Sequence, residues 1–115
     1  MDMDSQGNAT AAVGVDSASV EVSISDVLFD NRSLKDAIIE TGAGFYLVPS
    51  SVDLLFSEMK EAYQIDKARI LDDKLRIVED YFDYILIDSP SSASLLMMNA
   101  ILAADDIIIP LNSGK

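Results

Sequence analysis

Cysteine and histidine are both absent from the 115 residues of this chain. Their absence excludes disulfide bonds, thiolate nucleophiles, imidazole bases and metal sites built from cysteine or histidine ligands. Any catalysis by these residues must therefore use carboxylates, hydroxyls, amides or lysine.

Long apolar runs are missing too. The longest, such as residues 107–111, are far shorter than the roughly 20 apolar residues that a membrane-spanning helix needs. No charged segment followed by an apolar core marks a signal peptide. We therefore expect a cytoplasmic protein that does not contact a membrane.

Basic residues are scarce, since eight Lys and Arg stand against twenty Asp and Glu, for a net charge of −12. This charge repels nucleic acid and anionic membranes, so a basic DNA-binding face is not expected in these residues. Hydrophobic residues make up 50% of the chain and charged residues 24%. This balance is typical of a globular chain, and the length has room for one domain or part of one.

Predicted strands and helices alternate along the sequence. A weakly patterned surface connection at 9–23 precedes two short helices, one around 27–29 capped by Ser23 or Ser25, and one at 34–39 capped by Ser33. The predicted strands are 45–48, 84–88 and 107–109, and the predicted longer helices are 50–62, starting with Ser50 and Asp53, 66–80, and 93–103, capped by Ser91 or Ser92. This order predicts an α/β fold, with right-handed crossovers in a parallel sheet that helices flank.

Two aspartates lie at the ends of predicted strands. Asp88 ends one predicted strand, and Asp4 ends another ahead of a turn at Gly7. Parallel sheets bind ligands beyond the carboxyl ends of their strands, where two acids could support Mg²⁺ and orient an attacking water in phosphoryl transfer. Asp88 could instead cap a helix or start a turn with Pro90, and Asp2 could be solvated, structural or part of the site.

Other polar groups are weaker candidates. Glu58 and Glu61 share a helix but fit a solvated face, and the pair Met97–Met98 fits core filling. Ser89 has no histidine to activate it as a nucleophile. Lys115 ends a Ser-Gly-Lys that lacks the remaining positions of a phosphate-binding loop.

Taken in order, several stretches resemble the ParA/Soj partition ATPases, which are deviant Walker-type P-loop proteins related to MinD. Residues 2–10, DMDSQGNAT, are similar to the D-x-D-P-Q-G-N-A-T that ends the family's second strand. The stretches that follow in family order are SISDVLFD, SLKDAIIETG, FYLVPSSVDL, DYILIDSP, MNAILAAD and DIIIPLN. The series covers essentially the whole chain.

The resemblance implies roles for individual residues. Asp4 matches the switch I aspartate that helps to position the hydrolytic water, and Asp2 matches the first acid of the same motif. Asp88 matches the Walker B acid that supports Mg²⁺. Further candidates at the two switch turns are Gln6, Gly7, Ser89 and Pro90.

The resemblance also implies cofactors and partners for an intact domain. Family members bind ATP with Mg²⁺, close as homodimers over two nucleotides and hydrolyse ATP under stimulation by a ParB-type partner. They bind DNA non-specifically through regions that have no counterpart in these residues.

The sequence departs from the family in several places. Ser5 and Ser91 stand where the family commonly has proline, and PLNSGK lacks the Gln and Glu that usually follow the equivalent strand. The family's phosphate-binding K-G-G-x-G-K-T, later strands and basic C-terminal surface are not found in these residues. We therefore expect a partial domain in which 1–8 are the end of the second strand and switch I, 9–23 the surface connection, and 24–115 the alternating helices and strands.

The leading hypothesis is a fragment of a ParA-like ATPase that drives plasmid or chromosome partition, and whose isolated chain neither binds nor hydrolyses ATP. The alternatives are a non-catalytic interaction module, a MinD-like cell-division ATPase fragment, and an α/β domain whose acids only cap helices. A central sheet without its P-loop strand is also expected to expose an apolar edge that favours aggregation.

Overall fold

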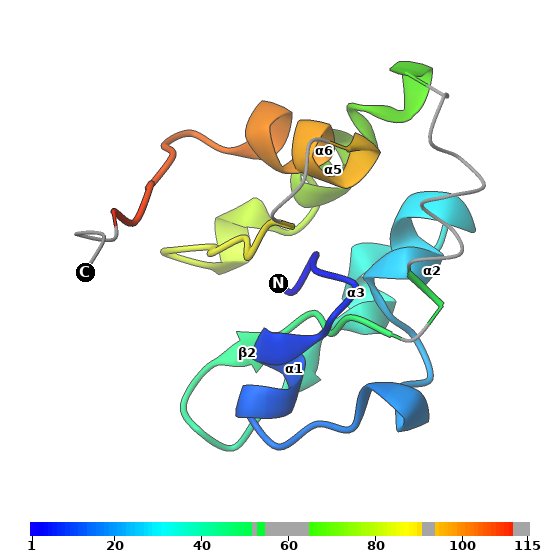
Figure 1. The fold of residues 1–115 in the computed structure, drawn as a ribbon, viewed down its shortest axis with the longest axis vertical. Helices are drawn as coiled ribbons and strands as arrows, with labels where there is room; N and C mark the ends of the chain where they lie inside the picture. The colour runs from blue at the N-terminus through cyan, green and yellow to red at the C-terminus, as the bar shows by residue number, and fades with distance from the viewer. Residues whose placement is uncertain (52, 55–64, 91–93, 112–115) are drawn as a thin grey trace.

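Short helices and extended segments alternate along the chain (Figure 1). The computed structural model describes residues 1–51, 53–54, 65–90 and 94–111. The helices are α1 (Asn8–Ala12), α2 (Ile24–Phe29), α3 (Leu34–Ala37), α5 (Ile70–Leu75) and α6 (Leu95–Ala103), the strands are β1 (Ile39–Glu40) and β2 (Tyr46–Leu47), and the 3-10 turns are η1 (Ser17–Ser19), η2 (Ile65–Lys67) and η3 (Glu79–Tyr81). In Figure 1, α5 and α6 lie together above the N-terminus, α2 and α3 lie to its right, and α1 and β2 lie below it. In the described part of the chain, no helix has the length and apolar character that a bilayer crossing requires.

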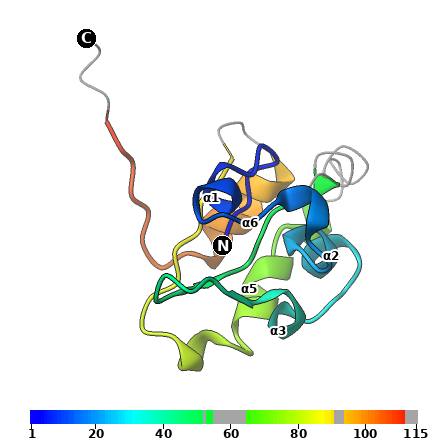
Figure 2. The same ribbon diagram turned by 90° about the horizontal axis from the view of Figure 1, so that it is seen from below.

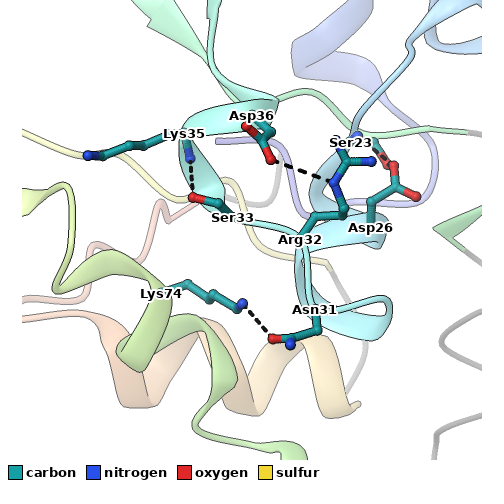
Figure 3. A network of polar contacts seen from close by, with 8 residues as sticks. All are labelled: Ser23, Asp26, Asn31, Arg32, Ser33, Lys35, Asp36 and Lys74. Carbon is teal, nitrogen blue, oxygen red and sulfur yellow. Dashed lines mark hydrogen bonds and ion pairs between the residues drawn. The ribbon is translucent and has the colours of Figure 1, made fainter.

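The short helices α2 and α3 begin at serine caps (Figure 3). Ser25 N donates to Ser23 Oγ. The side chain of Ser23 also accepts from Asp26 N, and Ser23 N donates to Asp26 Oδ2 at 2.8 Å, which together form a capping box. The amide of Lys35 donates to Ser33 Oγ at the start of α3. The prediction that Ser33 caps α3 is therefore confirmed. Of the two serines predicted as candidate caps of α2, Ser23 and Ser25, the cap is Ser23.

Polar contacts on the surface join the connection between α2 and α3 to α3 and to α5 (Figure 3). Arg32 Nε and Asp36 Oδ2 form an ion pair at 3.6 Å with both side chains about half exposed. Lys74 Nζ of α5 donates to Asn31 Oδ1 at 2.8 Å. Exposed contacts of this kind contribute at most about 1 kcal/mol each, so they orient these helices without deciding the fold.

A tight hairpin follows α3. β1 and β2 pair antiparallel, Thr41 Oγ1 donates to Phe45 O at 2.8 Å across the turn, and Gly42 adopts φ of 79°, a left-handed conformation that favours glycine. The helix prediction is therefore wrong at Ile38 and Ile39, since these β-branched residues leave the helix as an extended segment once the hairpin can close.

Extended segments lie on both sides of the N-terminal residues. Met3 N donates to Asp88 O and Asp88 N donates to Met1 O, both at 2.9 Å, which makes a parallel bridge between Asp2 and Asp88. On the other side, Asp2 N donates to Val48 O at 2.9 Å. The N-terminal segment therefore lies between the segments that contain Val48 and Asp88, and its pairing with Asp88 is parallel.

The strands are shorter than predicted. In the described part of the chain β2 has two residues, and the predicted strand at 84–88 keeps only the bridge at Asp88. Tyr84 is 89% exposed, and Ile108 is 84% exposed on a segment that runs away from the rest of the chain (Figure 2). The prediction of a strand at 107–109 is wrong, because no described segment pairs with its backbone.

The helix predicted at 66–80 is interrupted, and η2, α5 and η3 take its place. In a continuous helix Leu71 N would donate to Lys67 O, four residues earlier. Instead Leu71 N donates to Asn99 Oδ1, and Asn99 Nδ2 donates to Lys67 O, both at 3.0 Å. A side chain inserted between these two groups breaks the helix, although Leu71 and Leu75 are buried as the periodicity predicts.

Helix α6 begins later than predicted and is buried on one side. Met97 N donates to the capping Ser94 Oγ at 3.2 Å, whereas the predicted start at residues 91–93, with caps at Ser91 or Ser92, lies outside the described residues. The buried residues of α6 are Leu95, Leu96, Asn99 and Ala100, and the exposed ones are Met98, Ile101 and Leu102. The expectation of core filling is therefore wrong for Met98.

The hydrophobic core lies where α2, α5 and α6 meet the N-terminal segment. The core residues with no exposed surface are Met3, Ile24, Val27, Leu54, Leu71 and Leu96. Most of the predicted helix at 50–62, including Glu58 and Glu61, lies outside the described residues. The core therefore packs around Met3 of the N-terminal segment, while Asp4, at the end of that segment, is only partly buried.

Candidate functional site

Asp2 is fully buried, and its carboxylate is occupied by hydrogen bonds. Its Oδ1 accepts from Asp4 N at 3.1 Å, and its Oδ2 accepts from Thr10 N at 2.9 Å and from Thr10 Oγ1 at 2.7 Å. These donors replace water for a carboxylate that burial would otherwise destabilise. The sequence left open whether Asp2 is solvated, structural or part of the site. Its burial excludes a solvated side chain, and its hydrogen bonds favour a structural role in which Asp2 holds the following loop.

Thr10 and Ser50 extend the hydrogen bonds of Asp2. Ser50 N donates to Thr10 Oγ1 at 3.0 Å, and Ser50 Oγ donates to Asp4 O at 2.9 Å. Both side chains are fully buried. Sequence reasoning missed both residues as part of the site, and Ser50 was predicted instead as the start of a helix. No local signal could have found this contact, since Ser50 lies 46 residues from Asp4.

Asp4 begins a tight loop at the end of the N-terminal segment. Gln6 N donates to Asp4 Oδ1 at 3.0 Å, and Gly7 N donates to Asp4 O at 3.0 Å. Gly7 has φ of 68°, a left-handed conformation that lets the loop turn into α1. Gln6 is exposed and Gly7 is buried. Of the two carboxylate oxygens of Asp4, Oδ1 accepts the bond from Gln6 N, and Oδ2 takes no part in the bonds of this loop.

Asp88 lies beside this loop across the parallel bridge to Asp2. Its side chain is largely exposed. Partial desolvation raises the pKa of Asp88 above its ordinary value, and the negative charges of Asp2 and Asp4 raise that pKa further. The structure therefore brings the three predicted aspartates together at one edge, while Ser89 is exposed and Pro90 is buried just after them.

The oxygen donors of this edge suit a hard divalent cation such as Mg²⁺. Asp88 offers an exposed carboxylate, and Asp4 offers one oxygen beyond its turn. No group of three or more acidic residues in the described part could hold a metal ion alone. The donor set fits a Mg²⁺ ion that takes its remaining ligands from water and a phosphorylated substrate.

Comparisons with known proteins show the family of this chain. A family model described as an AAA domain matches residues 1–115. The sporulation initiation inhibitor protein Soj of Bacillus subtilis is 35% identical over 111 residues, which are 96% of this chain and 44% of Soj. The chromosome partitioning protein ParA of Myxococcus xanthus is 35% identical over 112 residues, which are 96% of this chain and 40% of ParA.

A solved structure is also similar. Cobyrinic acid a,c-diamide synthase from Mycobacterium smegmatis, with a bound ATP analogue and magnesium, matches with a TM-score of 0.92 and 31% identity. The match covers 99% of this chain and 47% of that chain. The predicted α/β fold is thereby confirmed, and the chain spans less than half the length of the proteins that it matches.

Proposed function

Since this chain belongs to the AAA-domain family of ParA/Soj-like P-loop ATPases, we propose that it forms the part of a Mg²⁺-dependent ATPase that carries the water-positioning and metal-supporting carboxylates. One observation carries the proposal. The parallel bridge between Asp2 and Asp88 brings Asp4 and Asp88 to the same edge of the fold, where α/β proteins bind their ligands.

The carboxyl groups of Asp4 and Asp88 have different roles in this proposal. Asp88 would hold Mg²⁺, and Asp4 would orient the water that attacks the terminal phosphate. Mg²⁺, when bound, neutralises charge that develops on the phosphates. Asp2 contacts neither, because its oxygens are buried and bonded to the loop.

We place the reaction in chromosome or plasmid partition, because the relatives include a chromosome partitioning protein. The proposed partners are a second copy of the ATPase, which closes over two nucleotides, and a ParB-type protein that stimulates hydrolysis. The chain itself carries a net charge of −12. Contacts with DNA are therefore assigned to other parts of such a protein.

The direct test is a chimera in which this chain replaces the matching residues of Bacillus subtilis Soj, so that Soj supplies the phosphate-binding loop. We expect this Soj chimera to hydrolyse Mg-ATP. Asp4→Ala should lower kcat by about 100-fold or more while leaving ATP binding intact, because it removes the group that orients the attacking water. Asp106→Ala, at an exposed acid away from the bridge, is the matched control.

The outcomes separate catalysis from the alternative of a non-catalytic module. A folded chimera that binds ATP but does not hydrolyse it would favour the interaction module. Equal turnover in wild type and Asp4→Ala would remove Asp4 from the site. The isolated chain should bind Mg-ATP more weakly than micromolar, as calorimetric titration would measure.

A further inference from the structure

The backbone N–H and C=O of Asp4 are both hydrogen-bonded to side chains of other residues. Its N–H donates to Asp2 Oδ1 at 3.1 Å, and its C=O accepts from Ser50 Oγ at 2.9 Å. Hydrogen bonds on both backbone groups restrict φ and ψ, and therefore the direction in which the side chain leaves the backbone.

Thr10 connects these two contacts. Its hydroxyl donates to Asp2 Oδ2 at 2.7 Å and accepts from Ser50 N at 3.0 Å. A hydroxyl has one proton to donate and lone pairs to accept with, so a single atom ties the N-terminal segment to the segment after β2. In the described part of the chain, no buried side-chain nitrogen or oxygen atom lacks a hydrogen-bond partner.

We infer that Thr10 and Ser50, together with Asp2, are positioning residues that hold Asp4 in the orientation needed to place the attacking water. The inference rests on the proposed role of Asp4 in hydrolysis. Thr10 has no place in the chemistry, because its hydroxyl is fully buried and engaged on both sides. Its effect is transmitted through the backbone of Asp4, where a misplacement of about 1 Å is enough to cost on the order of 100-fold in rate.

The orientation of Asp4 can be measured in the full 115-residue chain without nucleotide. Three-bond couplings between Hα and Hβ report the χ1 rotamer of Asp4 by NMR. We expect wild type and Thr10→Ser to show one rotamer, because serine keeps the hydroxyl. Thr10→Val keeps the shape but removes the hydroxyl, so its couplings should average between rotamers.

Two further variants complete the experiment. Ser50→Ala removes only the bond to Asp4 O, and it should shift the couplings in the same direction by less, because Gly7 N still donates to that oxygen. Thr41→Val is the matched control, since it removes a threonine hydroxyl that bonds within the hairpin turn. Its Asp4 couplings should equal those of wild type.

Unchanged Asp4 couplings in Thr10→Val would overturn the inference. If Thr10→Val does not fold, the comparison of wild type with Ser50→Ala decides, and unchanged couplings there overturn it equally. In the Soj chimera, Thr10→Val should lower kcat by about tenfold or more with KM for Mg-ATP within about twofold of wild type, and Thr10→Ser should restore kcat. A wild-type chimera without hydrolysis would refute the proposed function, while the couplings would still decide the positioning role.

Discussion

Two regions of this molecule each contain extended segments and differ in what surrounds those segments. The first contains residues 1–10 and 48–50, where Asp2, Thr10 and Ser50 are fully buried and bonded to one another or to the backbone. We call it the bonded region. The second contains residues 84–88 and 104–111, and we call it the open region. There Leu86 is 76% exposed and Ile109 is 73% exposed.

The difference shows that apolar composition alone does not make a strand. Backbone groups of an extended segment need partners on neighbouring segments. Met1–Met3 has such neighbours on both sides, and 84–88 has them at Leu86 and Asp88. Residues 107–109 have none in the described part of the chain, and they remain irregular.

The largest effect should come from breaking the bonded region at Asp2. Asp2→Ala leaves Asp4 N, Thr10 N and the Thr10 hydroxyl without their buried acceptor, and each such group costs about 1–3 kcal/mol. We expect the free energy of unfolding in urea to fall by about 3 kcal/mol or more. Asp106→Ala, exposed in the open region, should change it by less than about 0.5 kcal/mol. Equal losses in the two variants would erase the contrast between the regions.

The next effect concerns the contact that joins α5 to α6. Asn99→Ala removes the carboxamide that bonds Leu71 N and Lys67 O, so the free energy of unfolding should fall by about 2 kcal/mol. The matched control is Asn31→Ala, which loses one exposed bond to Lys74 and should cost less than about 0.5 kcal/mol. A gain in helical circular dichroism without loss of stability would instead mean that the helix closes across the gap.

Asp88 lies where the open region meets the bonded region, at the bridge to Asp2. Its folded-state pKa is raised above 3.8, so its protonated form is favoured in the fold. The contribution of this raised pKa to the stability of the fold is fully present below pH 3.8 and is lost as the pH rises through the raised pKa. Asp88→Asn should therefore stabilise the chain at neutral pH, by at most about 1 kcal/mol because the site is solvent-screened.

The pH dependence is the control for this prediction. The gain from Asp88→Asn, measured as the shift in urea midpoint, should shrink as the solution is acidified below 3.8. A gain that stays constant with pH would show that the charge of Asp88 is not its cause.

The smallest effect on stability should come from the open region. Ile108→Lys changes a side chain that is 84% exposed, so the free energy of unfolding should change by less than about 0.5 kcal/mol. Because the exposed apolar surface favours association, light scattering should show less self-association in this variant. Leu96→Ala, in the core, should cost about 2–5 kcal/mol by contrast. A large loss in Ile108→Lys would mean that the open region is packed in solution.

Local signals in the sequence predicted the starts of α2 and α3. Ser23 and Ser33 cap these helices because a serine hydroxyl accepts from an amide only two residues away. The positions of Asp4 and Asp88 at one edge could also be predicted, since each ends a predicted strand. The partners Thr10 and Ser50 could not, because the bond from Ser50 to Asp4 spans 46 residues.

The sequence by itself determined the alternation of helices and extended segments, the absence of cysteine and histidine chemistry, and the aspartates available for a metal site. Only the tertiary structure decided that Asp2 is enclosed while Asp88 is exposed, that Asn99 divides a helix, and that the segment at 107–109 is not a strand. The physical reason is the range of the interactions. Capping and periodicity act within a few residues, whereas strand pairing and the satisfaction of buried polar groups depend on segments that only the fold brings together.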